Sequence, residues 1–490
     1  MRTRVVALLP RLRGLLMHGG TQYWASSVLA SGAALLNNYA AALLLGPAIW
    51  GVWIGTRLLL TYGANLHLGT VDSMQRELPM LRDMGEEVRV RSTAFGIALS
   101  SAALAALLLF ALTWVLPLDD NWRLCLRFLA PTLVLLQASA YAGAVHRARQ
   151  RFDLVGRMSL AEALGHTVGV VLTLALGLHG FLAGVLLTYG AVAAYGLAVM
   201  ADLAKPAFHR GAARRLVSVG LPILGFVVAL QWMSTMDRVV VLGMFTEAEL
   251  GLYALGAMAF VLPHTVFNAA NSVVYALMCR RFGDDGQPRG LLADLLSSTA
   301  RLAALVGAVV ATIVIALPLA VRLLLPEYAG GVGAARVVVA GLFLVGLAGT
   351  SVNVLLALDL RRARNSALLL ASAVGFPASI LLARAGLGLE GVAGGAAAGY
   401  ATYFAATSRG ALRALDASGA EIRRFYASVL VPVGALAAVL LLALLPLRPW
   451  ILAAAQVAAV VILAGPSTWR RLREVLDTAP QAIGTEPAAR

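Results

Sequence analysis

The sequence predicts an all-α polytopic membrane protein with about 14 transmembrane helices. Three observations lead to this fold class. First, 60% of the 490 residues are hydrophobic and the mean hydropathy is +0.83. Second, charged residues make up only 13%, about half of the roughly 25% usual in soluble domains. Third, the apolar residues form runs of about 20, the length that crosses a bilayer. A soluble, disordered or disulfide-based protein is excluded, because such a chain cannot cover a water-facing surface with polar groups.

The apolar runs predict fourteen spans, separated by turn signals such as Gly46-Pro47 and Pro117–Asp120. Arginines between Arg2 and Arg13 resemble the start of a signal peptide. The apolar run that follows is about 23 residues, longer than the roughly 7–15 of a signal peptide, so we expect an uncleaved first span. The predicted spans are 22–45, 50–70, 93–116, 124–145, 159–178, 181–200, 216–241, 250–278, 302–321, 337–358, 366–383, 391–407, 426–445 and 450–466.

The distribution of basic residues tests this division of the chain into fourteen spans. The chain has 39 of them, all arginine except Lys205. If the N-terminus is cytoplasmic, 31 fall in cytoplasmic segments and 6 in outer segments, while Arg57 and Arg238 fall inside spans. Positive charge accumulates on the cytoplasmic side of membrane proteins. We therefore expect an even number of spans with both termini in the cytoplasm.

Two pairs of segments reveal an internal repeat. Residues 45–53 align with 245–253 at an offset of 200, and LGLHGFLAG at 176–184 aligns with LGLEGVAGG at 387–395 at an offset of 211. Six spans separate the copies, so the repeats run in the same direction through the membrane, as in one class of secondary transporters. The predicted organisation is a six-helix lobe at 1–215, a second at 216–425, two added helices at 426–466 and a cytoplasmic tail at 467–490.

The second predicted lobe resembles a known family. Gly220-Leu-Pro222, Asp237-Arg238, Gly251-Leu-Tyr253 and Leu325-Pro-Glu-Tyr328 are similar to segments of Wzx-type polysaccharide flippases. These belong to the multidrug/oligosaccharidyl-lipid/polysaccharide exporter superfamily.

The resemblance implies a flippase that moves an undecaprenyl-diphosphate-linked oligosaccharide across a bacterial inner membrane by alternating access, without ATP. Such a protein serves the synthesis of lipopolysaccharide, capsule or exopolysaccharide. Its partners would be the lipid-linked oligosaccharide, membrane lipid and a polysaccharide polymerase, with no nucleic acid; no cofactor is expected beyond a coupling ion, H⁺ or Na⁺. A lipid II flippase and a multidrug/cation antiporter of the same superfamily remain alternatives. A membrane polysaccharide polymerase or ligase is the alternative from another class, although no loop is long enough to form a catalytic domain outside the membrane.

Polar residues inside the predicted spans are the candidates for a substrate site. Arg57 is the first, because an intramembrane arginine is costly and normally faces a cavity or a partner. Its guanidinium would suit a diphosphate; the alternative is an arginine that extends toward the outer face. Asp237 and Arg238 form a second polar pair, and the offset of 200 places Asn37 and Asn38 at the equivalent point. These four would line the cavity rim, or Asp237-Arg238 would form an interhelix salt bridge.

Further candidates lie on spans 5 and 8. Glu162 is a candidate for ion coupling, because buried acids often mark ion pathways; the alternative is a solvated position at the cytoplasmic interface. His264, and His166 one turn after Glu162, could join a proton relay or simply pack in a helix. Asn268 and Asn271, one turn apart, are candidates to line the cavity.

No enzyme signature accompanies these residues. Lys205 lies between Ala204 and Pro206, so the chain lacks the Gly-Lys-Ser/Thr of a phosphate-binding loop. Gly386–Gly391 matches GxGxxG but belongs to a predicted outer hairpin. HExxH, GxSxG and Cys/His clusters are missing from the sequence. We therefore expect no catalytic residues and no metal site.

Overall fold

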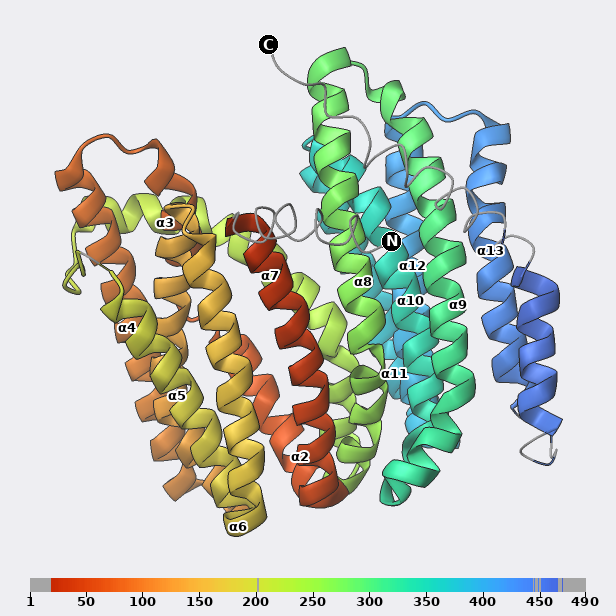
Figure 1. Cartoon of the computed structure of the whole chain (residues 1–490), viewed down its shortest axis with the longest axis horizontal. Helices are drawn as coiled ribbons and strands as arrows, with labels where there is room; N and C mark the ends of the chain where they lie inside the picture. The colour runs from red at the N-terminus through yellow and green to blue at the C-terminus, as the bar shows by residue number, and fades with distance from the viewer. Residues whose placement is uncertain are drawn as a thin grey trace, which may run out of the picture. The chain divides into compact units, whose positions relative to one another are not determined.

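The structure is a computed structural model that describes residues 19–465 and Trp469, apart from residues 201, 444, 446, 447, 449 and 450. The expected signal-like arginines and nearly all of the predicted tail lie outside the described residues. The chain divides into two compact units (Figure 1). Unit 1 contains residues up to Trp232 together with Phe245–Gly251, and unit 2 contains Met233–Met244 and the chain from Leu252. The division therefore falls within a helix, α7 (Arg210–Met244), at Trp232.

Long apolar helices build both units, which confirms the predicted all-α polytopic membrane class. Among the described residues, ten helical segments are long and apolar enough to cross a membrane, and Ile451–Gly465 is a shorter apolar helix. Besides α7, the α-helices are α2 (Gly19–Gly63), α3 (Thr70–Glu77), α4 (Met84–Val115), α5 (Asp120–Ala148), α6 (Phe152–Ala198), α8 (Glu247–Asp285), α9 (Leu292–Leu324), α10 (Val332–Ala357), α11 (Arg361–Leu382), α12 (Gly388–Ala414) and α13 (Gly419–Leu442). Short 3₁₀ turns η1 (Leu78–Met80), η2 (Pro288–Leu291) and η3 (Pro326–Gly331) and a π-helical turn η4 (Ala383–Leu387) connect some of them.

Three of the ten membrane-length segments fold back at glycines and so hold two spans each. The backbone leaves helical geometry at Gly46 in α2 and at Gly177 in α6, and η4 separates α11 from α12. These breaks yield thirteen spans in the described residues, and Ile451–Gly465 follows as a fourteenth apolar helix. The breaks coincide with the predicted turns between spans 1 and 2, 5 and 6, and 11 and 12.

The backbone also carries the predicted repeat. Gly177 has φ 54° and ψ −135°, and Gly388, at the offset of 211, has φ 55° and ψ −142°. This left-handed geometry is strained for any residue with a side chain. Two matched glycines in one unusual conformation are the mark of a structural repeat rather than of a chance sequence match.

The offset of 200 has a structural counterpart within unit 1. A Cβ on Gly51 would collide with the carbonyl of Glu247, and a Cβ on Gly251 would collide with the carbonyl of Pro47. The contact is reciprocal, since residues 47 and 51 correspond to 247 and 251.

Some helices begin or end differently from the predicted spans. The second span ends at Gly63 instead of residue 70, because residues 64–69 form turns and α3 begins at Thr70. At the other extreme, α4 begins at Met84 and α9 at Leu292, about nine residues before the predicted spans. Hydropathy locates only the apolar part of a helix, while capped polar turns extend it. Asp83 caps α4 by accepting a hydrogen bond from the backbone of Gly85.

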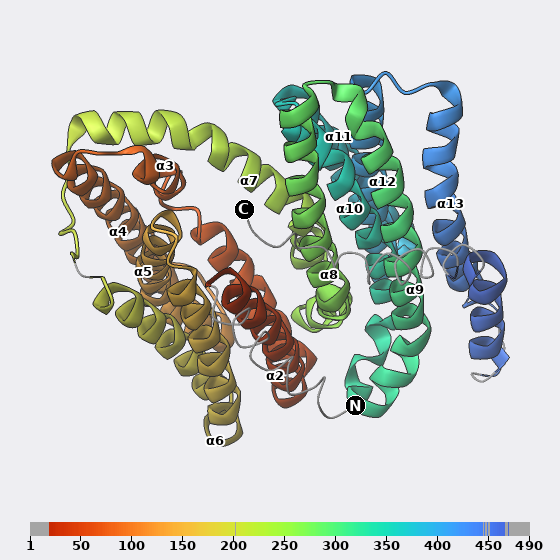
Figure 2. The same cartoon turned by 45° about the horizontal axis from the view of Figure 1, so that its top comes forward.

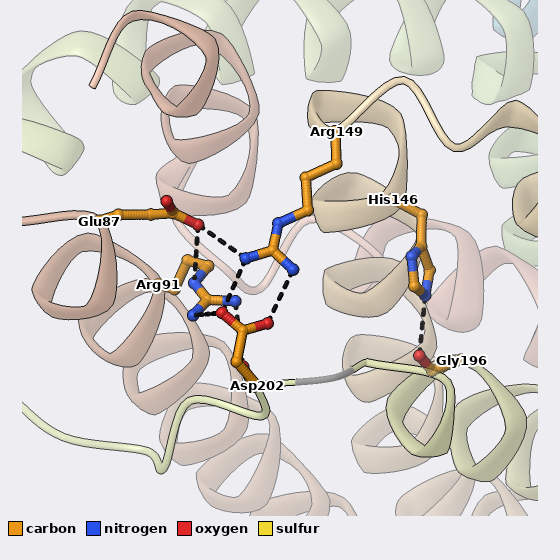
Figure 3. A network of polar contacts seen from close by, with 6 residues as sticks. All are labelled: Glu87, Arg91, His146, Arg149, Gly196 and Asp202. Carbon is orange, nitrogen blue, oxygen red and sulfur yellow. Dashed lines mark hydrogen bonds and ion pairs between the residues drawn. The ribbon is translucent and has the colours of Figure 1, made fainter. Parts of the chain in front are cut away.

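An ion-pair network joins three elements at one end of unit 1 (Figure 3). Asp202, in the segment between α6 and α7, accepts hydrogen bonds of 2.8 Å from Arg91 of α4 and from Arg149 after α5. Arg149 also donates to Glu87 at 2.8 Å. The Arg91 side chain is only 1% exposed, so its charge depends on these partners. Figure 2 shows α3 at the same end of the unit, near the start of α4.

Unit 2 contains a buried arginine that the charge count placed in an outer segment. Arg336 of α10 donates from Nε to the carbonyl of Val314 at 2.8 Å and from a terminal nitrogen to Gln456 at 3.3 Å. Gln456 in turn donates to the carbonyl of Val439 at 2.9 Å. Arg336 thus connects α10 with α9 and with the helix Ile451–Gly465.

Candidate functional site

A polar pocket lies within unit 1, between the two halves of α2 and the two halves of α6. Its empty volume, open mouth included, is about 670 Å³. Because both helices fold back at a glycine, each presents two spans to it. The lining residues recur at helical spacing, for example Trp53, Arg57 and Leu60, so one face of each span contributes. The lining residues are Ala34, Asn37, Asn38, Trp53, Arg57, Leu60, Glu162, His166, Val170, Phe181, Val185 and Tyr189.

Arg57 is the cationic group of this pocket. Its guanidinium donates a hydrogen bond of 3.3 Å to Oδ1 of Asn38, which lies across the fold in the first half of α2. The guanidinium is also close enough to act electrostatically on the Glu162 carboxyl and on the His166 ring. Arg57 is exposed and lines the pocket.

Glu162 and His166 form the opposite wall. They are one turn apart on α6, with Oε1 of Glu162 4.0 Å from Nε2 of His166. The ring of His166 meets the ring of Tyr189 edge-on, with centroids 6.0 Å apart. The lining of the pocket therefore includes a titratable carboxyl, an imidazole and a phenol besides one arginine.

Asn37 fixes the geometry of the pocket. Its amide nitrogen donates to the carbonyl of Ala163 at 3.1 Å, and its oxygen accepts from the Thr167 hydroxyl at 3.1 Å. Both bonds join α2 to α6. At another side of the pocket Trp53 and Phe181 meet edge-on at 4.9 Å, also between these helices. Asn37 is thus a positioning residue, whereas Asn38 contacts the guanidinium itself.

The repeat-related positions of unit 2 carry different chemistry. Asp237, the counterpart of Asn37, is fully buried, and its carboxylate accepts a 2.9 Å hydrogen bond from the hydroxyl of Tyr253, the counterpart of Trp53. The backbone N–H of half-buried Arg238 donates to the same carboxylate at 2.8 Å. The position equivalent to Arg57 is Ala257. Asp237 therefore joins α7 to α8, and unit 2 does not repeat the cationic pocket at these positions.

The remaining predicted residues lie on α8 in unit 2. The amide of Asn268 is 3.2 Å from the His264 ring, and both side chains are exposed. The side-chain amide of Asn271 donates to the carbonyl of Gly346 at 3.1 Å, and the backbone carbonyl of Asn271 accepts from the side-chain amide of Asn353 at 2.8 Å. The structure thus brings Arg57, Asn37, Asn38 and Glu162 into one pocket, while the α8 residues belong to the other unit.

Sequence reasoning did not select Trp53, Phe181 or Tyr189 as site residues. The repeat could have pointed to two of them, because Trp53 aligns with Tyr253 and Tyr189 with Tyr400. Aromatic side chains at matched positions of a repeat indicate a shared structural role. Phe181 carries no such signal, since it stands in an apolar run and only the fold-back at Gly177 brings it to the pocket.

The polar side chains of the pocket are the guanidinium of Arg57, the carboxyl of Glu162, the imidazole of His166, the phenol of Tyr189 and the amides of Asn37 and Asn38. Within the described part of the chain, no group of three or more His, Cys, Asp or Glu side chains is arranged to hold a metal ion.

Solved structures share this fold. A structure described as the lipid II flippase MurJ in an inward closed conformation matches with a TM-score of 0.70 and 14% identity, covering 93% of this chain and 99% of that one. A mutant of the MATE transporter VcmN of Vibrio cholerae matches with a TM-score of 0.56 and 17% identity, covering 84% and 99%. An outward-facing multidrug resistance MATE family transporter of the MOP superfamily gives 0.55 at 17% identity, covering 80% and 94%. At these identities the likeness concerns the fold: this is a multi-pass membrane protein with the fold of MOP-superfamily transporters.

The family follows from the sequence itself. A family model described as polysaccharide biosynthesis protein matches residues 82–329, half of the chain. This chain belongs to that family. A search of curated proteins found no match.

Proposed function

We propose that this protein is a flippase that moves an undecaprenyl-diphosphate-linked oligosaccharide across the bacterial inner membrane for the synthesis of a cell-surface polysaccharide. The observation that carries the proposal is Arg57, which lines a polar pocket walled by four spans. A guanidinium stays charged at any physiological pH and can grip phosphate oxygens with two parallel hydrogen bonds. Membership of a polysaccharide biosynthesis family supplies the substrate class, and the fold supplies a transporter scaffold.

The mechanism that fits this pocket is alternating access. The diphosphate-sugar head group would bind at Arg57 and Asn38 while the lipid tail remains in the membrane. Rocking of the two repeats would then expose the head group to the other side. The positive-inside distribution of arginines supports a cytoplasmic location for both termini, and a polysaccharide polymerase would consume the product.

Glu162 is the proposed coupling group in this cycle. When ionised, its carboxylate neutralises part of the field of Arg57 and opposes binding of an anion. A proton on Glu162 would leave the guanidinium charge to the diphosphate. Proton binding and substrate binding would therefore be linked at this pocket, with H⁺ as the proposed coupling ion. His264, beside Asn268, is the alternative coupling residue, and it lies in unit 2.

The test is an Arg57→Ala variant in cells that depend on this gene for polysaccharide export. Arg157→Ala is the matched control, because Arg157 is an exposed arginine of α6 that does not line the pocket. We expect Arg57→Ala to abolish export at normal membrane levels of the protein, with unflipped lipid-linked glycan on the cytoplasmic face. Normal export would refute the role of Arg57.

The location of the accumulated glycan also separates the alternatives. A polymerase or ligase defect would leave lipid-linked repeats on the outer face, where a membrane-impermeant oxidant reaches them. For a lipid II flippase, depletion would instead trap the peptidoglycan precursor inside. An antiporter would change drug or cation efflux and leave every lipid-linked glycan in place.

A further inference from the structure

A second pocket opens at one end of unit 2, between the beginnings of α9 and α13. Its empty volume, open mouth included, is about 940 Å³. It shares no residue with the pocket around Arg57, and the proposed flippase cycle does not use it. The lining residues are Arg289, Leu292, Ala293, Leu296, Ser297, Ala300, Glu421, Arg424 and Ser428.

Arg289 is held in place at this pocket by three acceptors. It donates to the carbonyl oxygens of Leu415 and Asp416 at the end of α12, and to Oε2 of Glu421 at 3.1 Å. Glu421 is itself fixed, because it accepts from the backbone and the hydroxyl of Ser418 at 2.7 Å as part of a capping box. The Arg289–Glu421 pair is therefore a rigid part of the wall.

Arg424 supplies the net positive charge of the pocket, because the charges of Arg289 and Glu421 cancel. It lies one turn after Glu421 on the same face of α13, is exposed, and forms no ion pair with any described residue. Two arginines against one glutamate give the pocket one net positive charge. Ser428, one turn further along α13, and Ser297 of α9 add hydroxyl groups deeper in the same pocket.

The α9 wall is mostly apolar. Leu292 and Leu296 are one turn apart, and Ala300 follows at the next turn. Exposed leucines elsewhere on α9, such as Leu319 and Leu323, mark the surface that faces lipid. The pocket thus combines a cationic rim, two hydroxyls and an apolar wall at the beginning of two membrane helices.

We propose that this pocket binds an anionic glycerophospholipid of the phosphatidylglycerol type. Basic pockets between transmembrane helices on the cytoplasmic side bind anionic lipid head groups. The arginine count places Arg289 and Arg424 on the cytoplasmic side, at the end of the helices where lipid phosphates lie. The phosphodiester sits against Arg424 at the rim, the ester oxygens of the glycerol backbone meet the hydroxyls of Ser297 and Ser428 deeper in the pocket, and an acyl chain continues along Leu296 and Ala300.

The charge of the pocket favours this lipid over a polyprenyl diphosphate. One net positive charge matches the single negative charge of a phosphodiester. A diphosphate carries at least two, and Glu421 would oppose the second. The apolar wall in turn favours a lipid over free inorganic phosphate.

The test is lipid binding to the purified full-length protein, measured by native mass spectrometry during titration. Phosphatidylglycerol, phosphatidylethanolamine, inorganic phosphate and undecaprenyl diphosphate are the four probes. The variant is Arg424→Gln. The control is Arg423→Gln, because Arg423 is the neighbouring arginine on α13 and is also exposed but does not line the pocket. Circular dichroism verifies that both variants are folded.

We expect phosphatidylglycerol to bind the wild type and Arg423→Gln alike, and Arg424→Gln about tenfold more weakly, the effect of one lost charge-assisted contact. Equal binding to all three proteins would overturn the proposal, and so would equal affinity for phosphatidylethanolamine. Displacement of phosphatidylglycerol by inorganic phosphate or by undecaprenyl diphosphate at lower concentration would assign the site to those ligands instead. The outcome does not depend on transport, so it stands apart from the proposed flippase function.

Discussion

Asp202→Asn tests the ion-pair network of unit 1. The substitution removes the charge that Arg91 and Arg149 share but keeps the shape of the side chain. Half of the Asp202 side chain is exposed, so its bonds to the partly exposed Arg149 are worth only about 0–1 kcal/mol. Arg91 decides the magnitude, because its side chain is 1% exposed and a buried charge that loses its partner costs about 3–5 kcal/mol.

Two acceptors of Arg91 survive the substitution and reduce this cost. The backbone carbonyl of residue 202 accepts at 3.1 Å, and the carboxylate of Glu87 lies 3.5 Å from Nε. We therefore expect Asp202→Asn to lower the free energy of unfolding by about 2–3 kcal/mol. The assay is a denaturant titration of the purified protein in detergent, followed by tryptophan fluorescence.

Asp153→Asn is the control. Asp153 pairs with Arg151 at 3.1 Å, but that arginine is more than half exposed, so the loss should be below about 1 kcal/mol. If both variants lose the same stability, or Asp202→Asn loses none, the buried charge of Arg91 does not depend on this carboxylate.

The same network predicts a pH dependence. Hydrogen bonds from Arg149, together with those from Arg91, hold the pKa of the Asp202 carboxyl well below its usual range. A depressed pKa contributes stability that is complete above the unfolded pKa of about 3.9 and is lost as the pH falls through the folded value. The difference in stability between wild type and Asp202→Asn should therefore be constant at neutral pH and shrink only below about pH 4.

Two further predictions concern the pocket and the repeat. Glu162→Gln removes the carboxylate beside Arg57, so it should tighten binding of the lipid-linked diphosphate, remove its pH dependence and slow transport; weaker binding of the purified variant would contradict the role given to Glu162. Gly51→Ala places a methyl against the carbonyl of Glu247 and should cost about 1–3 kcal/mol of stability. Gly32→Ala is the control in the same assay, since no atom lies within 4 Å of its added methyl, and an equal loss in both would disprove a specific contact at Gly51.

Fold class and repeat could be predicted from the sequence because each rests on a signal that the membrane imposes locally. The length of an apolar run determines a span. Gly177 and Gly388 occur in matching sequence segments because the backbone at both positions needs the same positive φ. The polar ends of α4 and α9 escaped prediction, since hydropathy marks where a helix enters hydrocarbon and not where its hydrogen bonds begin. Arg336 was assigned to an outer segment for the same reason, although its partner Gln456 makes burial possible.

The candidate site was only partly accessible to such reasoning. Arg57 and Glu162 stand out as charges in apolar segments, but their proximity depends on how the spans of α2 and α6 pack against each other, which no local pattern specifies. Asn37 and Asp237 were paired by the repeat offset, and the structure gives the two positions different surroundings. A sequence repeat predicts which positions have equivalent backbone locations. The side chain at each position then decides whether that position can bind a ligand or packs in the protein interior.

This divergence within the repeat bears directly on how a flippase of this kind would work. The backbone of both copies keeps the break near residues 46 and 246 and the glycine conformations at 177 and 388. Those backbone breaks let the helices fold back and would let them move as rigid bodies during transport. They would have the same role in both copies of the repeat. Head-group binding needs only one cationic pocket, and Arg57 has Ala257 as its counterpart. A second strong site would hold the diphosphate in place and raise the barrier to release, because binding that is equally tight before and after the conformational change does not drive transport. The buried Asp237–Tyr253 pair is therefore consistent with a copy that stabilises the scaffold while the pocket of unit 1 holds the charged substrate.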